Sequence, residues 1–121
     1  MNVKKTTPLL VVDHIEPSLP FWESLGWTKV AEVPHEGALG FVMFVGEGGE
    51  LMLQTRASVA ADLGDLSVSC ALYLDVDSID EAVASATGAR ILIRDRKTFY
   101  GSREAWVLDP AGHLIGFCEK G

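Results

Sequence analysis

The stretch that decides the fold is Trp106-Val107-Leu108-Asp109-Pro110-Ala111-Gly112-His113-Leu114-Ile115-Gly116-Phe117, which predicts a β-hairpin. Two apolar runs flank a turn in which proline presets the second residue and glycine can adopt a left-handed conformation. A type I turn followed by a glycine bulge makes Leu108 face Leu114. The same register makes Trp106 face Gly116, so the indole is expected to lie over a residue that has no side chain.

The rest of the chain repeats one order of elements, a strand, a helix and three strands. Strands of the first set are predicted at residues 7–12, 28–33, 40–45 and 50–56, with a helix over 19–25. Strands of the second set are predicted at 69–74, 90–93, 104–108 and 114–118, with a helix that Ser78 and Glu81 cap and Gly88 ends. An offset of 62 residues relates four identical pairs: Asp13 and Asp75, Gly26 and Gly88, Leu10 and Leu72, Val45 and Val107. Matching order with matching spacing indicates two βαβββ modules.

Chain length favours one domain that contains both modules. With 121 residues there is little room for two independent cores. We place module 1 at about 7–56, a linker at 57–68 and module 2 at about 69–119. Neither module is expected to be stable alone, because a single four-stranded sheet leaves one face in water.

Composition restricts the classes of function. Hydrophobic residues make up 48% of the chain, but no apolar run approaches the roughly 18 residues that span a bilayer. The short apolar run after the N-terminal lysines does not resemble a secretion signal, and Cys70 and Cys118 are expected to be buried free thiols, so we predict a cytoplasmic protein. A formal net charge of −7 disfavours nucleic acid as a partner.

The final hairpin, the strand-Asp13-helix-Gly26 opening and the repeat together resemble the vicinal oxygen chelate superfamily. Its members include glyoxalase I, extradiol dioxygenases, fosfomycin-resistance proteins and bleomycin-resistance proteins, and the match runs from about Thr7 to Glu119. The resemblance implies an α+β fold in which each module curls into a half-barrel. It also implies a cavity between two modules, which come from one chain or from two.

Metal-binding members of this superfamily place His or Glu ligands on the first and last strands of each module. The resemblance carries those positions to Thr7, Gln54, Ser69 and Gly116. Two hydroxyls, an amide and a glycine do not replace water at a transition metal, so we expect neither a metal nor another cofactor. The alternative is an alignment shifted by a residue or two, with ligands among His14, His35, Glu50, Glu104 and His113.

Strand alternation and the repeat predict the residues that line the cavity. The repeat places Phe44 beside Gln54, as Trp106 is beside Gly116. The complete set of predicted ligand-binding residues is Thr7, Phe44, Met52, Gln54, Ser69, Tyr73, Tyr100, Arg103, Glu104, Trp106, Leu114 and Gly116. The alternative for Trp106, Phe44 and Met52 is that they are ordinary core residues that fill the barrel, and for any one of them taken alone core packing is favoured. The segment 99–103 is either a lid over the cavity or a plain solvent-facing loop.

No nucleophile triad, phosphate loop or paired carboxylates indicate catalysis. The leading hypothesis is a non-catalytic protein that sequesters a small aromatic or cationic compound, as bleomycin-resistance proteins do. The alternative is a metal-dependent isomerase, lyase or dioxygenase that uses displaced ligands such as His35, Glu104 or His113. A third possibility is an interaction module whose cavity is filled by its own side chains. We also expect a homodimer, because such sheets leave open edges and apolar surface.

Overall fold

The computed structural model describes residues 2, 5–65, 67, 69–99 and 101–120. The predicted α+β class and the order of strands are confirmed, with two four-stranded sheets in the described part of the chain. The chain divides into two compact units. Unit 1 comprises residues 1–16 and 26–69, and unit 2 comprises residues 17–25 and 70–121.

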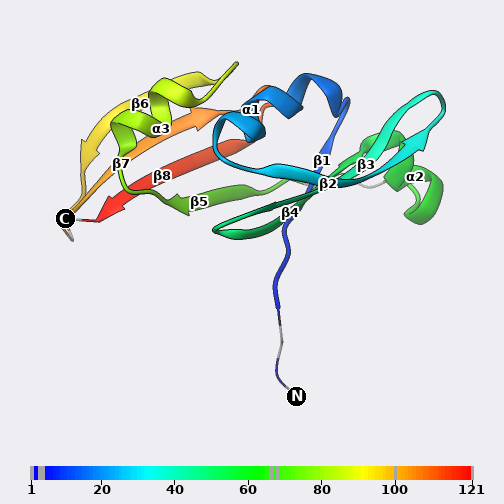
Figure 1. The fold of residues 1–121 in the computed structure, drawn as a ribbon, viewed down its shortest axis with the longest axis horizontal. Coiled ribbons are helices and arrows are strands. Elements are labelled where there is room, and N and C mark those ends of the chain that lie inside the picture. Colours follow the sequence, from blue (N-terminus) through cyan, green and yellow to red (C-terminus); the bar gives the residue numbers. More distant parts are fainter. Residues whose placement is uncertain (1, 3–4, 66, 68, 100, 121) are drawn as a thin grey trace. The chain divides into compact units, whose positions relative to one another are not determined.

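Unit 1 contains a mixed sheet with the strand order β1-β4-β3-β2 (Figure 1). Its strands are β1 (Leu9–Val12), β2 (Thr28–His35), β3 (Ala38–Gly46) and β4 (Gly49–Thr55). Only β1 and β4 run parallel, whereas the other neighbours are antiparallel. One face of this sheet forms the core of the unit, with these side chains fully buried or nearly so: Leu10, Val12, Val42, Phe44, Leu51 and Leu53.

The predicted linker, residues 57–68, contains most of a helix that was not expected, α2 (Arg56–Leu63). Thr55 caps this helix, because its hydroxyl accepts a hydrogen bond from the Ser58 amide at 3.2 Å. Val59 is the buried side chain of the helix. The sequence pattern concealed α2 because a helix with so little buried surface has no apolar stripe.

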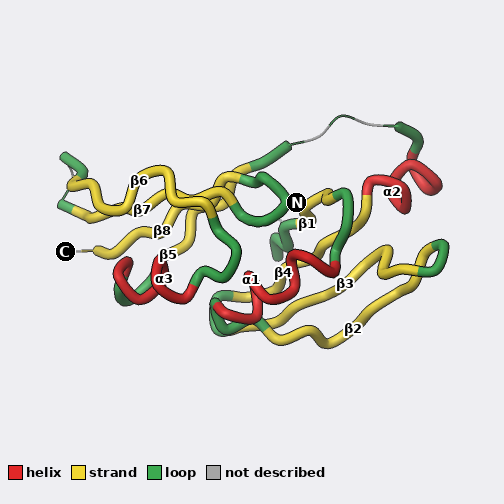
Figure 2. The backbone as a smooth tube through the Cα atoms, turned by 90° about the horizontal axis from the view of Figure 1, so that it is seen from above, coloured by secondary structure: helices red, strands yellow, loops and turns green. Residues whose placement is uncertain are grey.

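Unit 2 repeats the sheet order as β5-β8-β7-β6, again with one parallel pair, β5 and β8. The strands are β5 (Ala71–Asp75), β6 (Arg90–Lys97), β7 (Ser102–Leu108) and β8 (Leu114–Lys120). Helix α3 (Ile79–Ser85) packs on one face of this sheet (Figure 2). The buried side chains of that face and of the helix form the core of unit 2: Ala105, Val107, Ile115, Phe117, Ile79, Ala82 and Val83.

Helix α1 (Leu19–Ser24) follows a 3-10 turn, η1 (Glu16–Ser18), and belongs to unit 2. The Ser24 hydroxyl accepts a hydrogen bond from the Thr87 amide at 3.3 Å. Ser18 precedes α1 but does not cap it through its side chain, because its hydroxyl is buried and has no hydrogen-bond partner among the described residues. Gly26, with φ of +91°, ends α1 as predicted, and the Ser78 hydroxyl caps α3 by accepting from the Glu81 amide at 3.1 Å.

The final hairpin has the predicted register. Trp106 pairs with Gly116, and Leu108 pairs with Leu114. The Asp109 amide donates to the His113 carbonyl at 2.9 Å, and Gly112 has φ of +90°. The glycine bulge therefore fixes which face of β7 and β8 each side chain occupies.

Both cysteines are free thiols, but only Cys118 is buried; Cys70 is exposed, contrary to expectation. No helix in the described ranges has the length and apolarity needed to cross a membrane.

Candidate functional site

One face of the sheet in unit 2, opposite α3, carries two aromatic rings above a glycine. Gly116 pairs with Trp106 on one side and with Tyr73 on the other. The ring centroids of Tyr73 and Trp106 lie 5.7 Å apart, with the ring planes at 37°. A Cβ atom added to Gly116 would lie 2.7 Å from two carbons of the indole, so only glycine leaves room for the ring in this position.

A buried carboxylate holds both rings. The Glu104 side chain is 5% exposed, and its Oε2 accepts a hydrogen bond from the Tyr73 hydroxyl at 2.5 Å. Its Oε1 accepts from the Trp106 indole nitrogen at 3.1 Å and from Arg96 Nη2 at 3.0 Å. A buried carboxylate is tolerated when donors of this kind replace water. We call Tyr73, Arg96, Glu104, Trp106 and Gly116 the aromatic face.

Arg96 reaches the aromatic face through a β-bulge in β6. Ile93 pairs with Trp106, but the next pair is Arg96 with Glu104, so β6 holds one more residue than β7 between them. If the register of Ile93 with Trp106 had continued, Asp95 would lie opposite Glu104. Because a shift of one residue reverses the face of each side chain, the bulge turns Arg96 toward Glu104.

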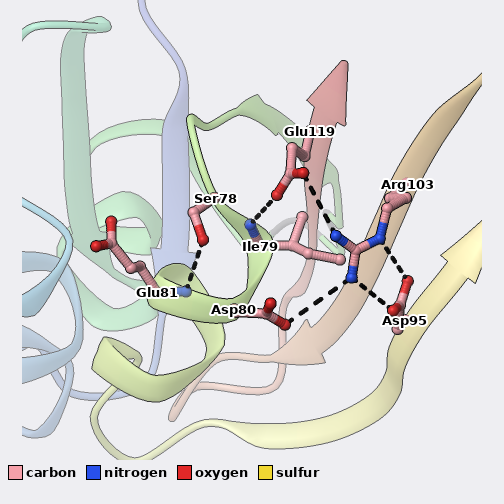
Figure 3. A network of polar contacts seen from close by, with 7 residues as sticks. All are labelled: Ser78, Ile79, Asp80, Glu81, Asp95, Arg103 and Glu119. Atoms are coloured by element: carbon pink, nitrogen blue, oxygen red, sulfur yellow. Dashed lines mark hydrogen bonds and ion pairs between the residues drawn. The ribbon is translucent and has the colours of Figure 1, made fainter. Parts of the chain in front are cut away.

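Arg103 lies on the other face of the sheet, beside α3 (Figure 3). Its guanidinium contacts Asp95 at 2.6 Å and Glu119 at 3.4 Å, with Asp80 of α3 4.0 Å away. The hydrogen bond from Arg103 holds the pKa of Asp95 below its ordinary value. Glu119 also accepts from the Ile79 amide at 2.9 Å, so this network ties the start of α3 to the sheet. The prediction that Arg103 lines the same surface as Trp106 is therefore wrong.

The predicted position of Phe44 beside Gln54 is also wrong. Gln54 pairs with Phe41, whereas Phe44 pairs with Leu51 and faces the buried core. The repeat fails here because Gly46 pairs with Gly49 across a two-residue turn, whereas five residues separate Leu108 from Leu114. A difference of three residues is odd, so the side chains of β3 exchange faces relative to those of β7.

The remaining predicted site residues divide between the two units. In unit 1, Met52 pairs with Met43, and the Gln54 amide donates to the Ser58 hydroxyl at 3.0 Å. Thr7 is half-buried and Ser69 is exposed, and each precedes the strand in which it was expected. In unit 2, Leu114 is half-buried. Tyr100 lies outside the described residues, and β7 already begins at Ser102, so the predicted loop over 99–103 is shorter than expected.

Sequence reasoning missed one residue of the aromatic face and the pairing of two strands in unit 1. Arg96 was missed because the register shifts in β6 have no clear signature in the sequence. The pairing of Phe41 with Gln54 and of Met43 with Met52 was missed because the repeat offset was extended through hairpins of different length. The two-residue turn Glu47-Gly48 was the signal that could have corrected the second error.

A metal does not fit the donors that the chain offers. Thr7, Ser69 and Gly116 provide no imidazole, thiolate or carboxylate, and the Gln54 amide is engaged with Ser58. Of the proposed displaced ligands, Glu104 already accepts hydrogen bonds on both oxygens. Within the described ranges, no three His, Cys, Asp or Glu side chains come together as a metal-binding group.

Comparison with known families gives one match that covers most of the chain. The family model described as the Glyoxalase/Bleomycin resistance protein/Dioxygenase superfamily matches residues 5–117. A search of curated proteins found no significant match.

Solved structures share the fold at low sequence identity. A glyoxalase-related enzyme from Fulvimarina pelagi is 21% identical, with a TM-score of 0.76, over 98% of this chain and 89% of that one. A superfamily member from Sphaerobacter thermophilus is 21% identical, with a TM-score of 0.75, over 98% of each chain. The bleomycin resistance determinant encoded on the transposon Tn5 is 17% identical, with a TM-score of 0.69, over 98% of each chain. These structures establish the likeness in fold.

Proposed function

The chain belongs to the glyoxalase, bleomycin resistance protein and dioxygenase superfamily, and we propose that it binds a flat organic compound without catalysing a reaction on it. The aromatic face is the proposed site. The ligand stacks on Trp106 and Tyr73, and Glu104 keeps the two rings in place. Sequestration of that compound is the corresponding biological role, and the likeness in fold to a bleomycin resistance determinant supports it.

The observation that carries this proposal is the arrangement of the rings around a buried carboxylate. Tyr73 is 48% exposed although its hydroxyl is hydrogen-bonded to Glu104, so the ring is both fixed and accessible. Rings held in this way lose little conformational freedom when a ligand stacks on them. Large aromatic side chains of this kind commonly dominate binding energy.

The chemistry of the face supports binding over catalysis. Glu104 has its oxygens occupied by three donors from the chain itself, so it is poorly placed to take a proton from a substrate. The Tyr73 hydroxyl donates a hydrogen bond to the same carboxylate. These groups therefore act by orienting the rings.

A titration with 2-naphthamide, a flat and uncharged probe, tests the proposal. We expect saturable binding by calorimetry, and we expect Trp106→Ala to weaken it by about 1–3 kcal/mol. Trp27→Ala is the matched control, because Trp27 is a half-buried tryptophan of unit 1. Metal-free bleomycin is the second probe, and competition with 2-naphthamide would assign both compounds to one site.

Two results would contradict the proposal. One is the absence of saturable binding for both probes. The other is binding that Trp106→Ala leaves unchanged while it lowers the free energy of unfolding by about 3–5 kcal/mol, since this is the behaviour of an ordinary core residue.

A further inference from the structure

We infer that the ligand of the aromatic face carries an anionic acceptor group, such as a carboxylate, and that Arg96 binds this group beside the stacked ring. The inference rests on the proposed function and names the ligand class of the same site. It replaces the expectation of a cationic ligand with that of a planar aromatic acid.

The position of Arg96 supports this assignment. Arg96 Nη2 and the Trp106 indole nitrogen donate to the same Glu104 oxygen, at 3.0 Å and 3.1 Å, so the two nitrogens lie within about 6 Å of each other. The Arg96 side chain is 52% exposed. A guanidinium has five N–H donors in a planar fork, and the contact with Glu104 uses one of them. The exposed part of the fork can therefore meet a carboxylate at the edge of the ring platform.

Glu104 is a poor partner for a cationic ligand. Its side chain is 5% exposed, and its charge is already paired with Arg96. A cation would have to displace Arg96 or approach a carboxylate that solvent hardly reaches. The Glu104 carboxylate, which could otherwise attract a cation to this face, is thus already paired with Arg96.

The bulge in β6 provides independent support. Bulges often turn a side chain toward a functional site. Here the shift between Ile93 and Arg96 places Arg96, and not Asp95, opposite Glu104. The strand also carries three other exposed basic side chains, Arg90, Arg94 and Lys97. The net charge of −7 repels an anion at long range. Because salt screens that repulsion beyond about 8–10 Å, the direct contact with Arg96 determines the preference for an anion.

Three probes with the same ring system test the inference: 2-naphthoate, 2-naphthamide and 2-naphthylmethylammonium. We expect wild-type protein to bind the carboxylate about tenfold more tightly than the amide, and to bind the ammonium most weakly. Arg96→Gln should remove the preference for the carboxylate while the affinity for the amide stays within about threefold. Arg96→Lys keeps the charge but loses the fork, so it should retain part of the preference.

Arg94→Gln is the matched control, because it removes the same charge from an exposed position on the same strand. It should leave the preference unchanged. Equal affinity for the three probes, tighter binding of the ammonium, or an equal loss for all probes in Arg96→Gln would overturn the role of Arg96 while the aromatic site stands. If none of the three probes binds, this inference fails, and if metal-free bleomycin does not bind either, the proposed function fails with it.

Discussion

Arg96 lies opposite Glu104 because β6 holds one more residue than β7 between this pair and the pair of Ile93 with Trp106. If the register of Ile93 with Trp106 continued along β6, Asp95 would lie opposite Glu104 and Arg96 would lie opposite Arg103. Like charges directly opposite each other destabilise a sheet. The bulge instead places Arg96 opposite Glu104, which it binds, while Arg103 lies opposite Lys97 and binds Asp95 on the other face.

A double-mutant cycle measures the pair on the aromatic face. Glu104→Gln should lower the free energy of unfolding by about 1–3 kcal/mol, because a neutral amide satisfies its three donors less well. The coupling between Arg96→Gln and Glu104→Gln should be about 0.5–1.5 kcal/mol, since Arg96 is half exposed. The matched control is the exposed pair Arg56 and Asp13, 3.1 Å apart, for which we expect less than about 0.5 kcal/mol. Urea denaturation provides the values, and equal coupling in both cycles would contradict the prediction.

The turn residue Asp109 should make stability depend on pH in an unusual direction. Burial raises the pKa of the Asp109 carboxyl, although hydrogen bonds from the backbone of His113 and Ala111 oppose the shift. As the pH falls through this raised pKa, the folded chain takes up the proton before the unfolded chain does. The contribution of Asp109 to stability therefore rises with falling pH and levels off below the unfolded pKa of about 3.9.

Asp109→Asn cannot titrate, so the stability of wild type relative to this variant should improve as the pH is lowered from about 7 to about 4. Asp95→Asn is a control of opposite sign. The pKa of Asp95 is lowered by Arg103, so wild type should lose its advantage over that variant as the pH falls through the lowered value. Urea denaturation at a series of pH values measures both differences. A wild-type advantage over Asp109→Asn that shrinks with falling pH would show that burial does not dominate at Asp109.

Local turn chemistry made most of the fold predictable. The proline and glycine of the final hairpin specify its register, so the position of Trp106 over Gly116 follows from sequence alone. The capping spacing of Ser78 and Glu81 likewise locates α3. The 62-residue offset holds for the outer pairing as well, because Val11 pairs with Gln54 as Tyr73 pairs with Gly116.

The remaining side-chain positions could not be predicted, because they depend on the number of residues in a turn or a bulge. The hydrophobic pattern of the sequence does not determine that number. The tighter first hairpin reverses Phe44, and the bulge in β6 brings Arg96 to the aromatic face. The hairpins differ by an odd number of residues, which exchanges the faces of the β3 side chains, and the register shifts in β6 change which residue lies opposite Glu104. The register of the final hairpin was therefore predicted correctly, and the positions in β3 were predicted incorrectly because the repeat was extended to them.

Purified protein should contain no stoichiometric transition metal. The reason is the chemistry of Thr7, Gln54, Ser69 and Gly116, which offer no charged or imidazole donor. Elemental analysis after dialysis without chelator checks this prediction. One equivalent of zinc, nickel, iron or manganese would contradict it, and it would revive the shifted ligands His35 and His113.

We expect a homodimer, with a mass of about 26 kDa by light scattering compared with 13.1 kDa for one chain. Two of the four edge strands in the described sheets each leave two apolar side chains exposed, Val30 and Val33 on β2 and Ile91 and Leu92 on β6. Two β6 edges would repel each other, because this strand carries four basic residues. Val33→Lys should therefore weaken the dimer more than Ile91→Lys does. A monomer at micromolar concentration would contradict the expectation of a dimer.

Gly116→Ala tests the geometry of the aromatic face with one methyl group. The new Cβ would lie 2.7 Å from Cη2 and Cζ3 of Trp106 and 2.9 Å from Cζ2, closer than such atoms approach, so the ring must move. Movement strains the 3.1 Å hydrogen bond between the indole and Glu104, and we expect a loss of about 1–3 kcal/mol in the free energy of unfolding. The indole N–H resonance of Trp106 should shift, and binding of 2-naphthamide should weaken. Gly48→Ala is the matched control, because a Cβ there meets nothing within 4 Å. An unchanged indole resonance with unchanged stability in Gly116→Ala would show that the ring does not rest on this glycine.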